Sequence, residues 1–166
     1  MLRIRPAGQA DIPLILEFIR DLATYERAPE QAVARPEDLR RDGWGPEPKF
    51  RVVIAEWDNR PAGFALFFYN YSTWQGRPGL YLEDLFVRPE FRGKGIGKSL
   101  LVHLAQIAVR ENCGRFVWQV LDWNQPAFDF YEALGAKKLT EWITMRIEGE
   151  ALERLAKTSA AANPRG

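Results

Sequence analysis

The order of the apolar segments predicts one α/β domain, with a central mixed antiparallel and parallel sheet and helices on both faces. Two strand–helix–strand crossings in the second half imply parallel pairing, because a crossover helix returns the chain in the same direction. Turn residues between two strand-like segments in the first half imply an antiparallel hairpin. The chain has 166 residues, 46% hydrophobic and 27% charged, which suits one ordinary domain. We expect that domain to cover residues 1–157, with residues 158–166 as a flexible tail.

The first half begins with a short strand and two helices. Residues 2–5 alternate like a strand and stop at Pro6. Asp11 can cap a helix that should end near Glu26, because its apolar residues recur every 3.6 positions. Pro36 opens a second helix, expected to end near residue 41. The hairpin follows, with strands at residues 51–57 and 62–71 and a turn at residues 58–61.

The second half alternates strands and helices. We expect strands at residues 80–87, at residues 116–121 and at residues 139–147. The middle one is almost continuously apolar, as in a strand buried on both faces. Helices should fill residues 96–112 and 126–135, and residues 149–157 should close the domain.

Composition excludes several classes of protein. The 23 Lys+Arg and 22 Asp+Glu leave a formal charge of +1, so we expect no nucleic acid or anionic membrane as partner. The longest apolar run, residues 62–69, is far shorter than the roughly 20 residues that span a bilayer. One cysteine, Cys113, and one histidine, His103, predict neither an internal disulfide nor a metal site. We therefore expect a cytoplasmic protein.

The most informative segment runs from Arg92 to Lys98 and reads R-G-K-G-I-G-K. Glycines at alternate positions let the backbone turn tightly and present N–H groups at the start of a helix, which suits a pyrophosphate. The spacing fits neither a P-loop nor a dinucleotide fingerprint. A glycine turn without a ligand is the alternative reading.

The segment resembles the (R/Q)-x-x-G-x-(G/A) coenzyme A signature of the GNAT superfamily of N-acetyltransferases. Two further segments resemble that superfamily's other motifs in the same order, the strand L-E-D-L-F-V at residues 82–87 and N-Q-P-A-F-D-F-Y-E-A-L-G-A at residues 124–136. The predicted order of elements fits the GNAT acyltransferase fold over residues 2–147. The resemblance implies a metal-independent N-acetyltransferase that uses acetyl-CoA.

Finer features resemble the diamine and spermidine/spermine acetyltransferase subfamily, and within it the thialysine acetyltransferase branch. The segments T-Y-E at residues 24–26 and D-W-N at residues 122–124 carry the first resemblance, and Y-S-T-W at residues 71–74 carries the second. The polyamine branch tends to have an acidic residue at the position of Ser72. After Glu141 this chain also lacks a few residues that relatives have. Both departures favour thialysine or lysine analogues, with diamines and polyamines second.

The resemblance implies roles for individual residues. Tyr131 is the general acid for the departing thiolate, since a phenol with a pKa near ~10 is protonated at neutral pH. Glu83 takes the proton of the amine, through water. Asp84 alternates to the opposite face of its strand unless the strand bulges there, and the resemblance implies such a bulge. Together with Glu83 and Asp84, we expect Tyr25, Glu26 and Glu141 to bind the amine.

Most coenzyme contacts should come from backbone. The pantetheine arm would pair like an added strand, the glycine segment would hold the pyrophosphate, and two further residues match positions that touch the coenzyme. The predicted coenzyme-binding residues are Leu85, Phe86, Val87, Arg92, Gly93, Lys94, Gly95, Ile96, Gly97, Lys98, Asn124 and Ala127.

Two alternatives stay open, a protein N-terminal or lysine acetyltransferase and a non-catalytic acyl-CoA-binding module. A module that only binds needs neither Tyr131 nor Glu83. The resemblance also implies a homodimer, and Trp74 is a candidate for the substrate entrance or the contact between subunits.

Overall fold

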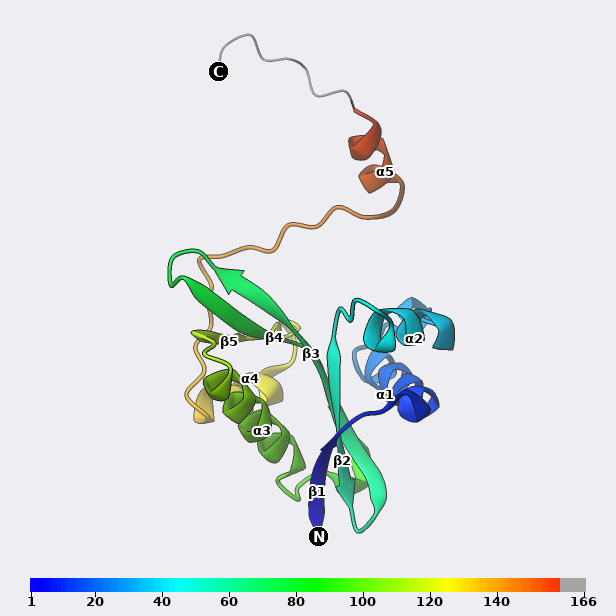
Figure 1. Cartoon of the computed structure of the whole chain (residues 1–166). Helices are drawn as coiled ribbons and strands as arrows, with labels where there is room; N and C mark the ends of the chain where they lie inside the picture. Colours follow the sequence, from blue (N-terminus) through cyan, green and yellow to red (C-terminus); the bar gives the residue numbers. More distant parts are fainter. Residues whose placement is uncertain (159–166) are drawn as a thin grey trace. The chain divides into compact units, whose positions relative to one another are not determined.

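The computed structural model describes residues 1–158 (Figure 1). Of the expected flexible tail, all but Thr158 lies outside these residues. The described elements belong to two compact units, one of residues 1–123 and one that begins at Asn124. Within residues 1–158, every helix is too short or too polar to cross a membrane.

The first unit contains a five-stranded sheet in the order β1-β2-β3-β4-β5. The first four strands pair with antiparallel neighbours, and β4 pairs with β5 in parallel, which confirms the mixed sheet. A two-residue turn joins β2 to β3. Its residues, Asp58 and Asn59, have φ values of 50° and 61°, as a type I′ hairpin requires. The strands are β1 (Leu2–Pro6), β2 (Arg51–Trp57), β3 (Arg60–Ser72), β4 (Arg77–Val87) and β5 (Arg115–Val117).

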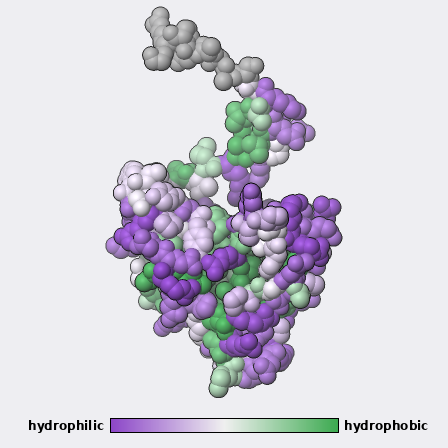
Figure 2. Space-filling view, viewed as in Figure 1, coloured by the Kyte–Doolittle hydropathy of each residue, from purple (hydrophilic) through white to green (hydrophobic). Residues whose placement is uncertain are grey.

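Helices cover both faces of this sheet, as predicted (Figure 1). On one face lie α1 (Ile12–Tyr25) and α2 (Pro36–Trp44), and on the other lies α3 (Ile96–Arg110). Three 3-10 turns complete the unit, η1 (Gln9–Asp11), η2 (Pro29–Gln31) and η3 (Pro89–Phe91). The only buried residue of α2 is Leu39, and the outside of this helix is largely hydrophilic (Figure 2).

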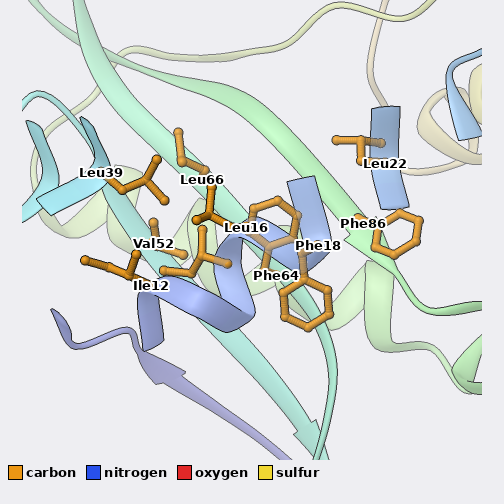
Figure 3. Close-up of a cluster of buried hydrophobic side chains, with 10 residues drawn as sticks. Ile12, Leu16, Phe18, Leu22, Leu39, Val52, Phe64, Leu66 and Phe86 are labelled. Atoms are coloured by element: carbon orange, nitrogen blue, oxygen red, sulfur yellow. The ribbon is translucent and has the colours of Figure 1, made fainter. Parts of the chain in front are cut away.

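The core between α1 and the sheet is a cluster of aliphatic and aromatic side chains (Figure 3). The Phe18 and Phe64 rings stack with their centroids 5.1 Å apart, and both side chains are fully buried. On the opposite face, α3 buries Ile96, Leu100 and Leu104 against the sheet. Because side chains alternate along β3, this strand contributes residues to the core under α1 and to the core under α3.

Two predicted details of the first unit are wrong. Asp11 stands at the start of α1 but makes no side-chain cap there, because its carboxylate accepts hydrogen bonds from the Arg5 guanidinium at 2.8 and 2.9 Å and from the Gly8 N–H at 2.7 Å. The strand expected at residues 116–121 is only β5, and its apolar residues are half-buried. It is short because β4, the one strand that pairs with it among residues 1–158, does so over three residues.

The second unit contains α4 (Gln125–Ala133) and α5 (Gly149–Lys157). The bounds of α5 match the prediction, and it carries apolar side chains on one side and polar ones on the other (Figure 2). The strand predicted at residues 139–147 is wrong. No strand among residues 1–158 pairs with this segment, so its backbone lacks the hydrogen bonds that define a strand, and Ile143 and Met145 are 84% and 87% exposed.

Candidate active site

The sheet of the first unit opens between β4 and β5. The parallel pairing joins Gly79, Leu80 and Tyr81 to β5 and ends there, while β4 continues to Val87. Over this last part β4 pairs with β3 on one edge, and no strand within residues 1–158 pairs with the other. The backbone N–H and C=O groups of that edge can therefore bond an extended ligand. Leu85, Phe86 and Val87, the residues predicted to bind pantetheine, lie in this part of β4.

The glycine segment follows η3 and leads into α3. Gly93 and Gly95 both have φ of +75°, a left-handed conformation that glycine adopts at little cost, and a Cβ at either would meet nothing within 4 Å. Gly95 is the residue before α3, and no side chain caps the helix. The first N–H groups of α3, which include those of Ile96 and Gly97, thus keep their bonding capacity next to the positive end of the helix dipole. This arrangement fits an anionic pyrophosphate.

The basic side chains of the glycine segment differ in their contacts. Lys94 places its Nζ 5.2 Å from the centre of the Trp57 ring, and Lys98 is exposed on the first turn of α3. The Arg92 Nε donates to the Val87 carbonyl at 3.0 Å, and the Arg92 guanidinium lies 5.2 Å from the centre of the Tyr25 ring. Arg92 therefore links the glycine segment to the end of α1.

A β-bulge at Glu83 brings two carboxylates of β4 into one neighbourhood. Leu82 pairs with Phe67 and Asp84 pairs with Leu66, so Glu83 has no partner on β3. An extra residue of this kind interrupts the alternation of side chains along a strand. The sequence allowed Glu83 and Asp84 to line one pocket only if such a bulge existed. The structure contains it.

Three carboxyl groups interact at this bulge. Burial raises the pKa of Asp84 to about 7, and the charges of Glu83 and Glu26 add to the effect. Partial burial and the charge of Glu83 raise the pKa of Glu26, which follows the last residue of α1. Like charges this close disfavour one another's ionised form. A cation would relieve the repulsion, so the cluster has the electrostatics of an ammonium-binding site.

Tyr25 and Arg27 flank Glu26 in the sequence, and the side chains of both lie against Trp123. The Tyr25 and Trp123 rings have centroids 6.3 Å apart. The Arg27 guanidinium carbon lies 3.9 Å from the centre of the Trp123 ring. Tyr25, Glu26 and Arg27 are consecutive, so the end of α1 places an aromatic, an anionic and a cationic side chain together.

The remaining predicted site residues belong to the second unit. Asn124 stands at the start of α4, where its side-chain oxygen accepts from the Ala127 N–H at 3.3 Å. Tyr131 lies on α4, half-buried, with its ring 5.2 Å from that of Phe130. Glu141 is exposed in the extended segment after α4.

Sequence reasoning assigned no role to Tyr81, Arg27 or Trp123. Burial and the charge of Glu83 raise the pKa of Tyr81, whose ring stacks on Phe68. The only sequence signal for Trp123 was its place in the D-W-N segment. Arg27 gave none, because its importance depends on a backbone conformation.

Ser72, one of the departures from the polyamine branch, is almost fully buried. Its Oγ accepts a hydrogen bond from the Gln75 N–H at 3.1 Å. It thus stabilises the turn between β3 and β4.

Residues 16–136 match the acetyltransferase (GNAT) family. The chain belongs to this family. It is an N-acetyltransferase, as the sequence indicated. The match includes β4, the glycine segment and α4, and therefore every predicted site residue except Glu141.

Relatives of known name support the predicted branch. A thialysine N-epsilon-acetyltransferase of Bos taurus is 42% identical over 164 residues, which cover 92% of this chain and 96% of that protein. An L-ornithine N5-acetyltransferase of Arabidopsis thaliana is 41% identical over 121 residues, which cover 73% of this chain and half of that protein.

Solved structures confirm the fold. An integron cassette protein from the mobile metagenome of V. cholerae superposes with a TM-score of 0.80 and 29% identity, covering 95% of this chain and 98% of that one. An aminoglycoside acetyltransferase from an uncultured soil sample, solved with sisomicin, superposes with a TM-score of 0.74. At 19% identity it supports the fold alone.

Proposed function

We propose that this enzyme transfers an acetyl group from acetyl-CoA to a primary amine of a small cationic molecule, with thialysine or a lysine analogue as the first candidate. The observation that carries the proposal is the bulge at Glu83, which gathers Glu26, Glu83 and Asp84 beside the unpaired part of β4. An anionic cluster next to an extended backbone edge suits a cationic acceptor and a coenzyme arm. The two named relatives, which act on thialysine and on L-ornithine, support the acceptor class.

The residues around the open edge fit coenzyme A. Leu85, Phe86 and Val87 would hold the pantetheine arm by backbone hydrogen bonds, and the N–H groups at the start of α3 would hold the pyrophosphate. When bound, acetyl-CoA supplies the acetyl group as a reactive thioester. Lys94 and Lys98 would add positive charge near the phosphates, and Asn124 and Ala127 would contact the coenzyme.

The acceptor amine must lose a proton, because a lysine-like amine has a pKa near ~10.4. In the proposed mechanism Tyr25, Glu26, Asp84 and Glu141 bind the ammonium form. Glu83 accepts its proton through a water molecule, and the free amine attacks the carbonyl carbon. As the C–N bond forms, the C–S bond breaks, and Tyr131 donates its phenolic proton to the departing sulfur. The proton that the new amide nitrogen must then lose passes to the Tyr131 phenolate and restores the phenol.

A thiol-release assay with acetyl-CoA tests the proposal. The acceptors are thialysine, lysine, ornithine, short diamines, spermidine and a lysine-containing peptide. We expect turnover with the small amines, and a loss of roughly 10²–10⁴-fold in kcat for Tyr131→Phe with little change in coenzyme binding. Phe130→Leu, which alters the neighbouring ring but leaves the phenol, is the matched control.

Other results would redirect the assignment. Turnover of the peptide alone would favour a protein acetyltransferase. Coenzyme binding without turnover of any acceptor would favour a binding module. Full activity of Tyr131→Phe would remove Tyr131 as the acid. The proposed homodimer is a separate expectation, and light scattering of the purified chain measures it directly.

A further inference from the structure

Arg27 occupies a backbone position that normally belongs to glycine. After α1, the Ala28 N–H donates to the Ala23 carbonyl at 2.9 Å and the Arg27 N–H donates to the Thr24 carbonyl at 3.1 Å. These two bonds form a Schellman motif, in which the residue at the Arg27 position adopts a left-handed conformation. Arg27 has φ of +63°, which costs a residue with a Cβ roughly 1–2 kcal/mol compared with a right-handed one. Such an outlier suggests that the side chain is used.

The Arg27 side chain is held in place by an aromatic ring and not by an ion pair with any carboxylate of the described residues. Its guanidinium stacks on Trp123 at 3.9 Å, and within residues 1–158 no carboxylate forms a salt bridge with it. The adjacent residue, Glu26, belongs to the cluster of three carboxylates. The Arg27 guanidinium is thus fixed on Trp123, solvent-exposed, unpaired with any carboxylate of the described residues, and available to an anion.

We propose that Arg27 binds the carboxylate of the acceptor, and that the enzyme therefore selects amino acids with a distal amine over diamines and polyamines. This inference rests on the proposed function. A lysine- or ornithine-like molecule carries an ammonium group at one end and a carboxylate at the other. The carboxylate cluster fits the first group and Arg27 the second. A diamine would instead place a second positive charge near Arg27, so the same residue attracts one class and repels the other.

Trp123 and Tyr25 act in this arrangement as positioning residues. The planar guanidinium stacks on Trp123, whose ring packs near that of Tyr25, which in turn faces the Arg92 guanidinium. Arg92 in turn donates a hydrogen bond to the Val87 carbonyl. The contacts through Trp123, Tyr25 and Arg92 therefore connect the proposed carboxylate site to the strand proposed to hold the coenzyme.

The test compares matched acceptors that differ only in the carboxylate, ornithine with 1,4-diaminobutane and lysine with 1,5-diaminopentane. For each acceptor, kcat/KM is measured with the full chain and saturating acetyl-CoA. We expect the wild-type enzyme to prefer the amino acid of each pair. In Arg27→Gly the kcat/KM for the amino acids should fall at least about tenfold, the usual effect of losing a charge-assisted hydrogen bond, while that for the diamines stays level or rises.

Two further variants separate charge from backbone effects. Arg27→Gly removes the strain of a left-handed backbone at a residue with a Cβ, so this variant should fold at least as stably as the wild type. Asn59→Gly makes the same backbone change at φ of 61° in the β2–β3 turn, and should leave both acceptor classes unaffected. Arg27→Gln keeps the backbone strain without the charge, and should lose selectivity as Arg27→Gly does.

The inference is overturned if the wild type prefers the diamines, if Arg27→Gly lowers kcat/KM equally for both members of a pair, or if Arg27→Gln keeps the selectivity. Each of these results leaves the proposed acetyltransferase function standing. Absence of turnover with every amine would instead refute the proposed function, and this inference with it.

Discussion

Replacing Asp84 with asparagine should stabilise the protein at neutral and alkaline pH but not at acidic pH. The pKa of Asp84 rises from 3.8 to about 7 on folding, chiefly because the group is buried. Between these values the folded protein holds a proton that the unfolded chain has released, so the stability of the wild type falls as the pH rises through this window. Below pH 3.8 both states are protonated, and the contribution vanishes.

The size of the effect follows from the two pKa values. Each pKa unit corresponds to about 1.4 kcal/mol, so the change from 3.8 to about 7 amounts to roughly 4 kcal/mol at pH 8. This figure is an upper limit, because Glu26 and Glu83 share the charge and can relax as the cluster ionises. Asparagine has nearly the same shape and no titrating group. Asp84→Asn therefore removes the free-energy cost of ionising this buried carboxyl in the folded state.

Urea unfolding at a series of pH values between 4 and 8 measures the difference. The stability gained in Asp84→Asn should be near zero at the acidic end and increase with pH. Asp21→Asn, which alters an exposed carboxylate on α1, serves as the control and should give a flat difference. A difference that is equally flat for Asp84→Asn would refute the reasoning that burial at the bulge raises the pKa of this carboxyl.

Two further predictions concern the glycine segment and the core. Gly95→Ala forces a left-handed residue at φ of +75°, and we expect a loss of about 1 kcal/mol in stability together with weaker acetyl-CoA binding by calorimetry. Gly76→Ala, at φ of +66° in the β3–β4 turn, should cost similar stability and leave coenzyme affinity intact, so equal affinities for both variants would contradict the proposed pyrophosphate site. Phe64→Ala removes the ring stacked on Phe18 and should lower the unfolding free energy by roughly 3–5 kcal/mol in urea, and a loss below ~1 kcal/mol would mean that the core is not packed as described.

Local patterns were sufficient where an element is determined by its own residues. The periodic apolar positions of α1, such as Ile15 and Leu16, are buried in the core, and α5 begins and ends where its sequence predicts. The strand expected at residues 139–147 failed because alternation alone supplies no partner for the backbone. The length of β5 has the same cause, since its pairing depends on where β4 diverges.

The candidate site was predicted in its residue types more than in its geometry. The L-E-D-L-F-V motif contains Glu83 and Asp84, but only the resemblance to the family implied the bulge between them. The bulge depends on the register between β3 and β4, which no local pattern encodes. The sequence did not indicate a role for Arg27, for a related reason. Its stacking on Trp123 arises only when the end of α1 meets a residue 96 positions later in the chain.

The divergence of β4 from β5 leaves the last part of β4 with one edge that no strand of residues 1–158 pairs with. Unpaired edges invite pairing with foreign strands and hence aggregation. A ligand that bonds along this edge would protect it, and would also stabilise the fold by about 2.7 kcal/mol at a concentration one hundred times its dissociation constant. The supply of coenzyme would then govern how long the molecule survives as well as how fast it works, so its abundance in a cell would follow the level of its own substrate.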